Sequence, residues 1–409
     1  MTQRIDIAGI RTRVIDPQFG AGGQGQAMLV DLEDLSGTQM VLKILSVKPD
    51  TEARLKWLCQ KNLSRLSPAF AAPIVCETKG DGNILHLAPL ASGVPQDEDP
   101  PRALPYNLQI CLEFVCLLQL LEENGLSHGD IAPSNLFIAP DGSVGLIDFD
   151  GFLSFDPDVP PPDTIGQRPM LAPEQRDGTC QTPTRESGYF QAAIMMSMIL
   201  TGRYPTDGLP SEPNAVDRMI CQGHWPEHDR PVGVDDLPIE ALGFELVTLF
   251  DRAFSLNPAD RPGPDEWRRA LTRALHNCWI HDCGVAFVAD VTTVACPGCT
   301  AAISIPKATR QLKLQVLPNG PRYGVDLVDQ KLIVLGRTTM PGLPPTVSGR
   351  HLEILPFKNK LLLRHVGSNP TLIQRNGQWY QLRETWLHET SLNAPIELQL
   401  ATTLIRLLL

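Results

Sequence analysis

A polar segment in the middle of the chain, interrupted by one tight hairpin, constrains this sequence more than any other feature. His128, Asp130 and Asn135 precede two short apolar runs joined by an Asp-Gly turn, and Asp148 and Asp150 follow them. Apolar runs around an Asp-Gly dipeptide are typical of a β-hairpin. Because a hairpin returns the chain to its starting point, the thirteen positions from Asn135 to Asp148 are expected to bring both side chains to one place.

These side-chain types suit phosphoryl transfer. Such a reaction needs hard oxygen ligands for Mg²⁺ and a carboxylate beside the attacking hydroxyl. Asn135 and Asp148 are the expected metal ligands, and Asp130 is expected to orient the nucleophile and accept its proton. The alternative is that the same residues only cap turns in a catalytically inactive fold.

A glycine-rich turn near the N-terminus indicates a phosphate-binding loop. Gly20, Gly22 and Gly25 form a G-x-G-x-x-G between two predicted strands. A Rossmann unit needs a helix directly after the glycines, whereas residues 27–32 have the pattern of a strand. A strand–loop–strand arrangement lets backbone N–H groups close over the phosphates of a nucleotide instead. Lys43, one strand later, is costly to bury without an anionic partner, which the α/β phosphates would supply.

From residue 10 to about residue 270 the chain resembles the protein kinase family, and within it the bacterial Ser/Thr kinases. Four motifs of that family occur in order: the catalytic loop, the metal-binding D-F-G, the A-P-E that closes the activation segment, and a late arginine motif. They are His128-Gly-Asp130-Ile-Ala-Pro-Ser-Asn135, Asp148-Phe149-Asp150, Ala172-Pro173-Glu174 and Asn257-Pro-Ala-Asp-Arg261-Pro262.

The resemblance implies ATP and Mg²⁺ as cofactors and hydroxyls on proteins as acceptors. It also implies a buried, structural ion pair between Glu174 and Arg261. A kinase lysine has a glutamate partner, for which Glu52 is the candidate here. Catalytic roles fall to Asp130, Lys43, Asn135 and Asp148.

Four positions depart from the family pattern. Gly129 replaces the catalytic-loop arginine, Ala132 a lysine, Asp150 the glycine of D-F-G, and Ser187 the aspartate of the central helix. Without that arginine, control through a phosphorylated activation loop is not expected.

Two alternatives to an active protein kinase stay open. One is a pseudokinase adaptor that binds nucleotide and docks phosphoproteins, and the other is a small-molecule kinase of the aminoglycoside phosphotransferase type, which shares His-Gly-Asp but lacks Ala-Pro-Glu.

A cysteine cluster predicts a zinc ribbon. The spacing is C-x₄-C-x₁₂-C-x₂-C. Each pair of nearby cysteines forms a turn known as a zinc knuckle, and two knuckles together make a tetrahedral structural Zn²⁺ site. The alternatives are two free pairs or a disulfide, and His281 stands as a replacement for either cysteine of the first pair. Bacterial kinases encoded beside tellurite-resistance-type von Willebrand proteins and metal-dependent phosphatases are similar here, which implies such proteins as partners. The cysteines are Cys278, Cys283, Cys296 and Cys299.

The last hundred residues resemble the forkhead-associated domain, a β-sandwich whose loops bind phosphothreonine peptides. The resemblance rests on Leu-Gly-Arg, Ser-Gly-Arg-His, His-Val-Gly-Ser-Asn and Arg-Asn-Gly segments, the last at 375–377. It departs from the family at Gly349, where an arginine is usual, and at Pro370. It implies a phosphothreonine-containing partner, and the alternative is a sandwich that serves only as a scaffold. The expected peptide-binding residues are Arg337, Ser348, Arg350 and Asn369, with His351 bracing the loop.

Composition sets the remaining expectations. The chain has 409 residues, of which 43% are hydrophobic and 20% charged, as in a globular protein. A net charge of −11 speaks against nucleic-acid and membrane partners. The first 30 residues lack a signal-type apolar run, so we expect a cytoplasmic protein. The predicted class is α+β: a bilobal kinase-like domain (1–274), a zinc ribbon (275–308) and a forkhead-associated-like sandwich (309–409).

Overall fold

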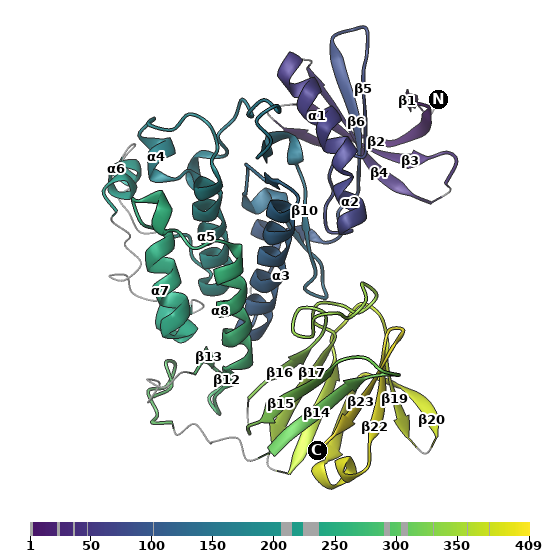
Figure 1. The fold of residues 1–409 in the computed structure, drawn as a ribbon, viewed down its shortest axis with the longest axis vertical. Coiled ribbons are helices and arrows are strands. Elements are labelled where there is room, and N and C mark those ends of the chain that lie inside the picture. The colour runs from purple at the N-terminus through teal and green to yellow at the C-terminus, as the bar shows by residue number, and fades with distance from the viewer. Residues whose placement is uncertain are drawn as a thin grey trace.

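The computed structural model describes most of the chain (Figure 1). A sheet, a helical body, a small cysteine module and a second group of sheets follow one another in sequence order. The mixed helix and strand content agrees with the predicted α+β class. The described ranges are 3–22, 25–35, 37–46, 48–100, 102–205, 215–223, 237–289, 295–303, 310–329, 331–357, 359–375 and 377–409.

The N-terminal sheet has six antiparallel strands in the order β1-β2-β3-β4-β6-β5. Side chains alternate along β4, so Met40 and Leu42 are buried on one face and Lys43 lies on the other. The helices α1 (Pro49–Lys61) and α2 (Leu63–Leu66) follow β4. The strands are β1 (Arg4–Ile7), β2 (Ile10–Gly22), β3 (Gly25–Leu32), β4 (Gln39–Ser46), β5 (Val75–Thr78) and β6 (Asn83–Pro89).

The helical body surrounds one large apolar core. The Thr184 hydroxyl accepts a hydrogen bond from the Ser187 N–H at the start of α5, and Gly202, with a φ of 75°, ends that helix. The described helices are α3 (Leu104–Glu123), α4 (Pro173–Arg176), α5 (Arg185–Thr201), α6 (Ala215–Cys221), α7 (Gly243–Ala253) and α8 (Pro264–His276). Short 3₁₀ turns are Gln96–Glu98, Pro133–Asn135, Phe149–Gly151, Arg168–Met170, Ile239–Leu242, Pro258–Asp260 and, in the C-terminal part, Glu389–Asn393.

Helix α3 is long and apolar enough to cross a membrane, and among the described helices it alone meets that test. Its most apolar window has a mean hydropathy of 1.5, and 67% of that window is buried inside the protein. The core helix of a soluble protein has the same properties, and α3 packs against α5 and α8.

The predicted Asp-Gly hairpin is confirmed. It joins β9 (Leu136–Ile138) to the antiparallel β10 (Val144–Leu146), and β7 (Val94–Pro95) lies beside β9. Gly142 has a φ of 81° and donates its N–H to the Ala139 carbonyl at 2.9 Å, as a tight turn requires. A second small pair, β8 (Leu126–Ser127) with β11 (Leu153–Ser154), joins the chain just before the polar segment to the chain just after it.

After the helical body come a two-stranded module and two larger sheets. The module pairs β12 (Cys278–Ile280) with β13 (Ala286–Val288). The two sheets, of six and four strands, share one buried core, and Figure 1 shows them below α3 and α8. We call them the C-terminal sandwich. Its strands are β14 (Arg310–Val316), β15 (Arg322–Leu327), β16 (Ile333–Leu335), β17 (Leu352–Phe357), β18 (Lys360–His365), β19 (Thr371–Arg375), β20 (Gln378–Leu382), β21 (Glu384–His388), β22 (Ile396–Leu400) and β23 (Thr403–Leu408).

Candidate active site

Lys43 joins the N-terminal sheet to the loop that follows the hairpin. Its Nζ lies 2.6 Å from Asp148 Oδ1 and 3.0 Å from Asp150 Oδ2. Burial acts to lower the pKa of Lys43, but the carboxylates of Asp150 and Asp148 outweigh it and raise that pKa. Asp148 has a φ of 62°, a conformation that a residue with a side chain keeps only where the surroundings enforce it. The lysine is therefore fully charged and fixed by two carboxylates.

Asp130 and Asn135 meet on the other side of the hairpin. The Asn135 side-chain amide donates to the Asp130 carbonyl at 2.9 Å and to Asp130 Oδ2 at 3.3 Å. The Ile147 N–H donates to the Asn135 carbonyl at 3.0 Å, which ties the catalytic-loop segment to the residue before Asp148. The structure thus brings together the four residues that the sequence predicted to meet.

The environment of Asp130 is suited to a proton acceptor. Burial raises the pKa of Asp130, and the nearby Asp148 carboxylate raises it further, while His128 and Asn135 act against this. Its Oδ1 is buried and has no hydrogen-bond partner within the described residues. His128 lies beneath, with Nε2 at 2.8 Å from the Ile147 carbonyl oxygen. The carboxylate therefore keeps acceptor capacity beyond its contacts with Asn135 and the Gln167 N–H.

Gln191 supports the catalytic loop, a role that the sequence had not revealed. Its Oε1 accepts a hydrogen bond from the Ile131 N–H at 3.2 Å, and its side chain is buried. Ser187, at the position where the family has an aspartate, caps its own helix instead. The signal available in the sequence was a glutamine, four positions after Ser187, within an otherwise apolar stretch.

Gly129, where the family has an arginine, is explained by close packing. Its φ is 77°, and a Cβ there would collide with the Gly151 carbonyl. A side chain at this position would therefore separate the loop that holds Asp130 from the loop that holds Asp148 and Asp150.

The predicted phosphate-binding glycines lie on a β-hairpin, as expected for a strand–loop–strand arrangement. Gly20 pairs with Ala27, and Gly22 pairs with Gly25, in the β2–β3 ladder. A Cβ on Gly25 would collide with the Ile44 carbonyl, so this glycine allows β3 and β4 to approach. No helix follows the glycines, which rules out the Rossmann arrangement.

The prediction that Glu52 pairs with Lys43 is wrong. Glu52 Oε1 lies 2.6 Å from Lys56 Nζ, one turn along α1, where both side chains are partly exposed. The helix residue that faces the site is Arg54, which is buried and donates to the Asp150 and Phe152 carbonyls. Helix α1 therefore presents a cation to the loop of Asp148 and Asp150, and Lys43 pairs with the carboxylates of that loop instead of one from the helix.

Asp150 occupies the centre of this arrangement. His86, directly opposite Lys43 in the β4–β6 ladder, places Nε2 3.3 Å from Asp150 Oδ1. Although burial acts to raise it, His86 and Lys43 hold the pKa of Asp150 well below its usual range. The sequence marked Asp150 as a departure from D-F-G, but it gave no sign of the partner on β6.

The predicted ion pair between Glu174 and Arg261 is confirmed. Two parallel contacts of 2.7 Å join the guanidinium to the carboxylate, and the Arg261 side chain has no exposed surface. The guanidinium also lies over the Phe190 ring, 5.2 Å from its centre. This pair ties the segment after the activation loop to the end of the helical body.

Comparisons with known proteins agree with this geometry. The chain is similar to a probable serine/threonine-protein kinase of Corynebacterium efficiens, with 29% identity over 171 residues. It is also similar to the serine/threonine-protein kinase PksC of Streptomyces coelicolor, with 27% identity over 179 residues. These similarities support a protein-kinase-like family. The matches cover 40% and 42% of this chain but only 24% and 30% of the two relatives, and no family model matches.

Beyond this kinase-like site, the cysteine module contains a possible metal site. The ligand atoms of His281, Cys283, Cys296 and Cys299 all lie within 4.8 Å of one another. The Cys283 and Cys296 sulfurs are 3.6 Å apart, too far for a disulfide and close to the separation of two sulfurs on one tetrahedral metal.

Cys278 does not belong to this set, so the prediction of four cysteine ligands is wrong at one position. Its side chain is fully buried in the large core of the helical body, whereas Cys296 belongs to a separate small cluster. Burial raises the pKa of the Cys278 thiol to about 12, which disfavours its thiolate form in this core. In the described structure His281, and not Cys278, completes the group of four side chains that could hold a metal ion.

In the C-terminal sandwich, hydrogen bonds connect the segments that carry the predicted peptide-binding residues Arg337, Ser348 and Asn369. The Arg337 N–H donates to the Ser348 carbonyl at 3.1 Å, so the two loops are adjacent. The Ser348 hydroxyl is 2.9 Å from Ser368 Oγ, and the Asn369 amide donates to the Thr346 carbonyl at 2.9 Å. His351 Nδ1 accepts from the Ser348 N–H at 3.1 Å and braces the loop as expected.

The expected contact from Arg350 to a phosphate is not supported. Its guanidinium is buried, pairs with Glu353 and lies over the Tyr106 ring of α3. This arginine is therefore part of a contact with the helical body.

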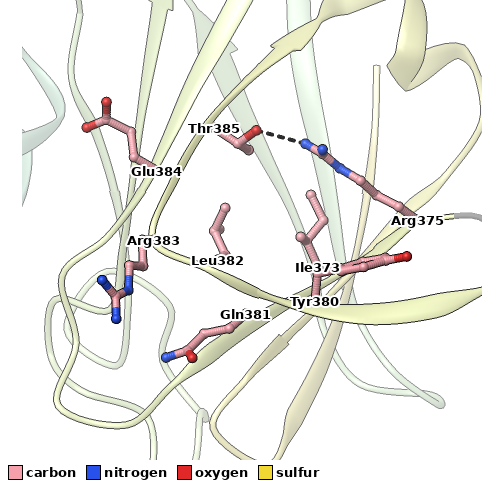
Figure 2. A pocket seen from close by; sticks show the side chains of 8 residues that line it. All are labelled: Ile373, Arg375, Tyr380, Gln381, Leu382, Arg383, Glu384 and Thr385. Carbon is pink, nitrogen blue, oxygen red and sulfur yellow. Dashed lines mark hydrogen bonds between the residues drawn. The ribbon is translucent and has the colours of Figure 1, made fainter.

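A pocket of the sandwich is lined by residues of β19, β20 and β21. Figure 2 shows it between β19 and the β20–β21 turn, where Arg375 donates to Thr385 Oγ1 at 2.8 Å. None of the predicted peptide-binding residues line it. Asn376, from the Arg-Asn-Gly segment of the sequence prediction, falls outside the described residues.

Proposed function

We propose that this chain is an ATP- and Mg²⁺-dependent protein serine/threonine kinase. One observation carries the proposal: Lys43, Asp130, Asn135 and Asp148 come from three segments of the chain and meet around one hairpin. The Asp130 carboxylate accepts from the Asn135 amide and from the Gln167 N–H, which leaves acceptor capacity for a further partner. A hydroxyl that enters as substrate would supply that partner.

The donor set fits Mg²⁺. Asp148 offers a partly exposed carboxylate, and Asn135 offers an amide oxygen to which the Ser134 hydroxyl donates only a long hydrogen bond of 3.5 Å. These are the hard oxygen ligands that Mg²⁺ takes beside nucleotide phosphates. When bound, the ion would neutralise charge on the transferred phosphoryl group.

The chain's own residues then have distinct roles. The charged Lys43 ammonium would hold the α/β phosphates, beneath the backbone of the Gly20–Gly25 hairpin. Asp130 would orient the acceptor hydroxyl and take its proton, for which the raised pKa of a buried carboxylate is suited. Gln191 would fix the loop that carries this base.

Transfer of radiolabel from γ-labelled ATP to casein or to the chain itself tests the proposal. The wild type is expected to label, and Asp130→Ala is expected not to, while still binding ATP because Lys43 and Asp148 are intact. Equal labelling by the two proteins would refute the enzyme. ATP binding by both without transfer would favour the pseudokinase adaptor, for which the alanine at position 132 is the supporting observation.

For the cysteine module we propose a structural Zn²⁺ ion held by His281, Cys283, Cys296 and Cys299. One imidazole and three thiolates form a familiar tetrahedral zinc set with no open position for catalysis. The ion would fix the segment that connects the helical body to the sandwich.

For the C-terminal sandwich, the proposal is a phosphothreonine-binding role that uses Arg337 and Ser348, with Asn369 toward the peptide backbone. A fixed guanidinium beside a hydroxyl donor suits a dianionic phosphate. Partner proteins with a phosphorylated threonine, in the cytoplasm, are the corresponding ligands. A labelled phosphothreonine peptide and its unphosphorylated twin test this role, and equal binding of both would exclude it.

A further inference from the structure

One face of helix α3 is covered by two loops of the C-terminal sandwich. Tyr106, Gln109 and Glu113 are spaced three and four positions apart, so they share that face. The loops are residues 336–338 and 348–350, which hold the arginine and serine proposed to bind phosphate. We call them the paired loops.

The contacts between α3 and the paired loops are direct and buried. The Gln109 amide donates to the Thr338 hydroxyl. The Arg350 guanidinium carbon lies 4.5 Å from the centre of the Tyr106 ring, within the range of a cation–π contact. Gln109 and Glu113 are only 1% and 7% exposed. Such burial of polar side chains is costly unless they are satisfied at the contact.

At Gly349 the loop lies so close to α3 that a Cβ has no room. A Cβ at this position would collide with the Glu113 carboxylate. The forkhead-associated resemblance leads one to expect an arginine at Gly349, where no side chain fits here. A Cβ at Gly336 would in turn collide with the Gly349 carbonyl, so the paired loops also need glycines to lie against each other.

The contact extends from Arg337 to the core of the helical body. The Arg337 guanidinium is close enough to Glu113 to act against the effect of burial on that carboxyl group. The contact is also continuous with the core, because Leu332 and Val334 belong to the same buried cluster as α3 and α8.

We propose that the paired loops form a docking surface whose occupant is helix α3 of the same chain, with the Glu113 carboxyl group seated against Gly349. The sandwich is then held against the helical body by the same loops that would read phosphothreonine. A phosphothreonine peptide has to displace α3 before it binds, and this consequence rests on the phosphothreonine role proposed above.

Gly349→Ala tests the docking, because it adds a Cβ at the Glu113 carboxylate. Small-angle X-ray scattering is expected to show a larger radius of gyration for this variant, and Gly349→Ala/Glu113→Ala is expected to return to the wild-type value. Gly80→Ala is the matched control, since a Cβ there meets nothing within 4 Å. Circular dichroism verifies that each variant is folded, and Glu113→Arg, which faces Arg337, provides a second route to the expanded state.

An unchanged radius in both Gly349→Ala and Glu113→Arg would overturn the proposal. So would a double variant as expanded as Gly349→Ala, since the collision would then not involve Glu113. Fluorescence anisotropy with a labelled phosphothreonine peptide adds a second readout. If the undocked form is a minor population, Gly349→Ala should bind at least about tenfold more tightly than wild type.

The radius of gyration and the peptide binding together separate the docking proposal from the phosphothreonine proposal. Expansion of Gly349→Ala without any peptide binding would uphold the docking and remove the phosphothreonine role. Wild-type binding as tight as that of Gly349→Ala would show that α3 does not occupy the loops, and would overturn the docking.

Discussion

Lys43 Nζ lies 3.0 Å from Asp150 Oδ2, so the lysine of this kinase-like site takes a second carboxylate from the loop that carries Asp148. Helix α1 contributes Arg54 instead, which holds the Asp150 backbone carbonyl. Kinases that pair this lysine with a helix glutamate can be switched by moving the helix. Here both partners of the lysine belong to one loop, so we expect the position of the lysine to depend on that loop.

Replacing Asp150 should weaken phosphoryl transfer by misplacing Lys43. A hydrogen bond to a charged group contributes about 1.5–3 kcal/mol, so Asp150→Asn should lower kcat/KM for ATP roughly 10- to 150-fold. Glu52→Gln is the matched control and should leave it unchanged, because Glu52 pairs with Lys56. Steady-state transfer assays measure both, and a greater loss in Glu52→Gln would contradict the pairing seen here.

Breaking the pair between Glu174 and Arg261 should destabilise the helical body. Removing one partner of a buried pair leaves an uncompensated charge, at a cost of about 3–5 kcal/mol. Arg261→Ala should therefore lower the free energy of unfolding in urea by about that amount. Arg252→Ala breaks the exposed pair with Glu266 and should cost less than about 1 kcal/mol. Similar losses in the two variants would mean that burial does not determine the effect.

The metal content of cysteine variants should separate ligands from core residues. Purified wild type is expected to hold one equivalent of zinc, and Cys283→Ser and His281→Ala should lose most of it because each removes a ligand. Cys278→Ala should keep its zinc, since that thiol lies in the core of the helical body. Inductively coupled plasma mass spectrometry gives the values. Zinc loss in Cys278→Ala with full occupancy in His281→Ala would restore the four-cysteine site.

Stability should fall as the pH rises because of Glu113. Burial raises the pKa of Glu113 from 4.5 to about 7, and the nearby Asp141 raises it too, while Arg337, the Val144 N–H and Gln109 act against this. The folded state therefore favours the protonated acid. The stability linked to this proton is full below the unfolded pKa of 4.5 and is lost as the pH rises through about 7.

The loss should approach about 3 kcal/mol, from the size of this shift. Urea unfolding at about pH 5 and about pH 8 measures it, and Glu113→Gln should lose less stability between these values. If wild type and Glu113→Gln change equally, then other groups account for the pH dependence.

The sequence determined the elements and the central motif by local rules. The pattern of residues 27–32 predicted the strand β3, and an Asp-Gly turn between apolar runs predicted the hairpin that brings Asn135 and Asp148 together. These depend on neighbours in the chain, so a single sequence contains them. The Glu174–Arg261 pair, although distant, could be predicted because both residues stand in recognisable motifs.

Only the tertiary structure decided which groups become partners. Asp150 meets His86 through a strand pairing, His281 replaces Cys278 because that thiol points into the core, and Glu113 meets Gly349 across two units of the fold. Nothing in the spacing of these residues encodes such contacts. They follow from packing, since a buried charge takes whatever counter-charge the surrounding elements bring within reach.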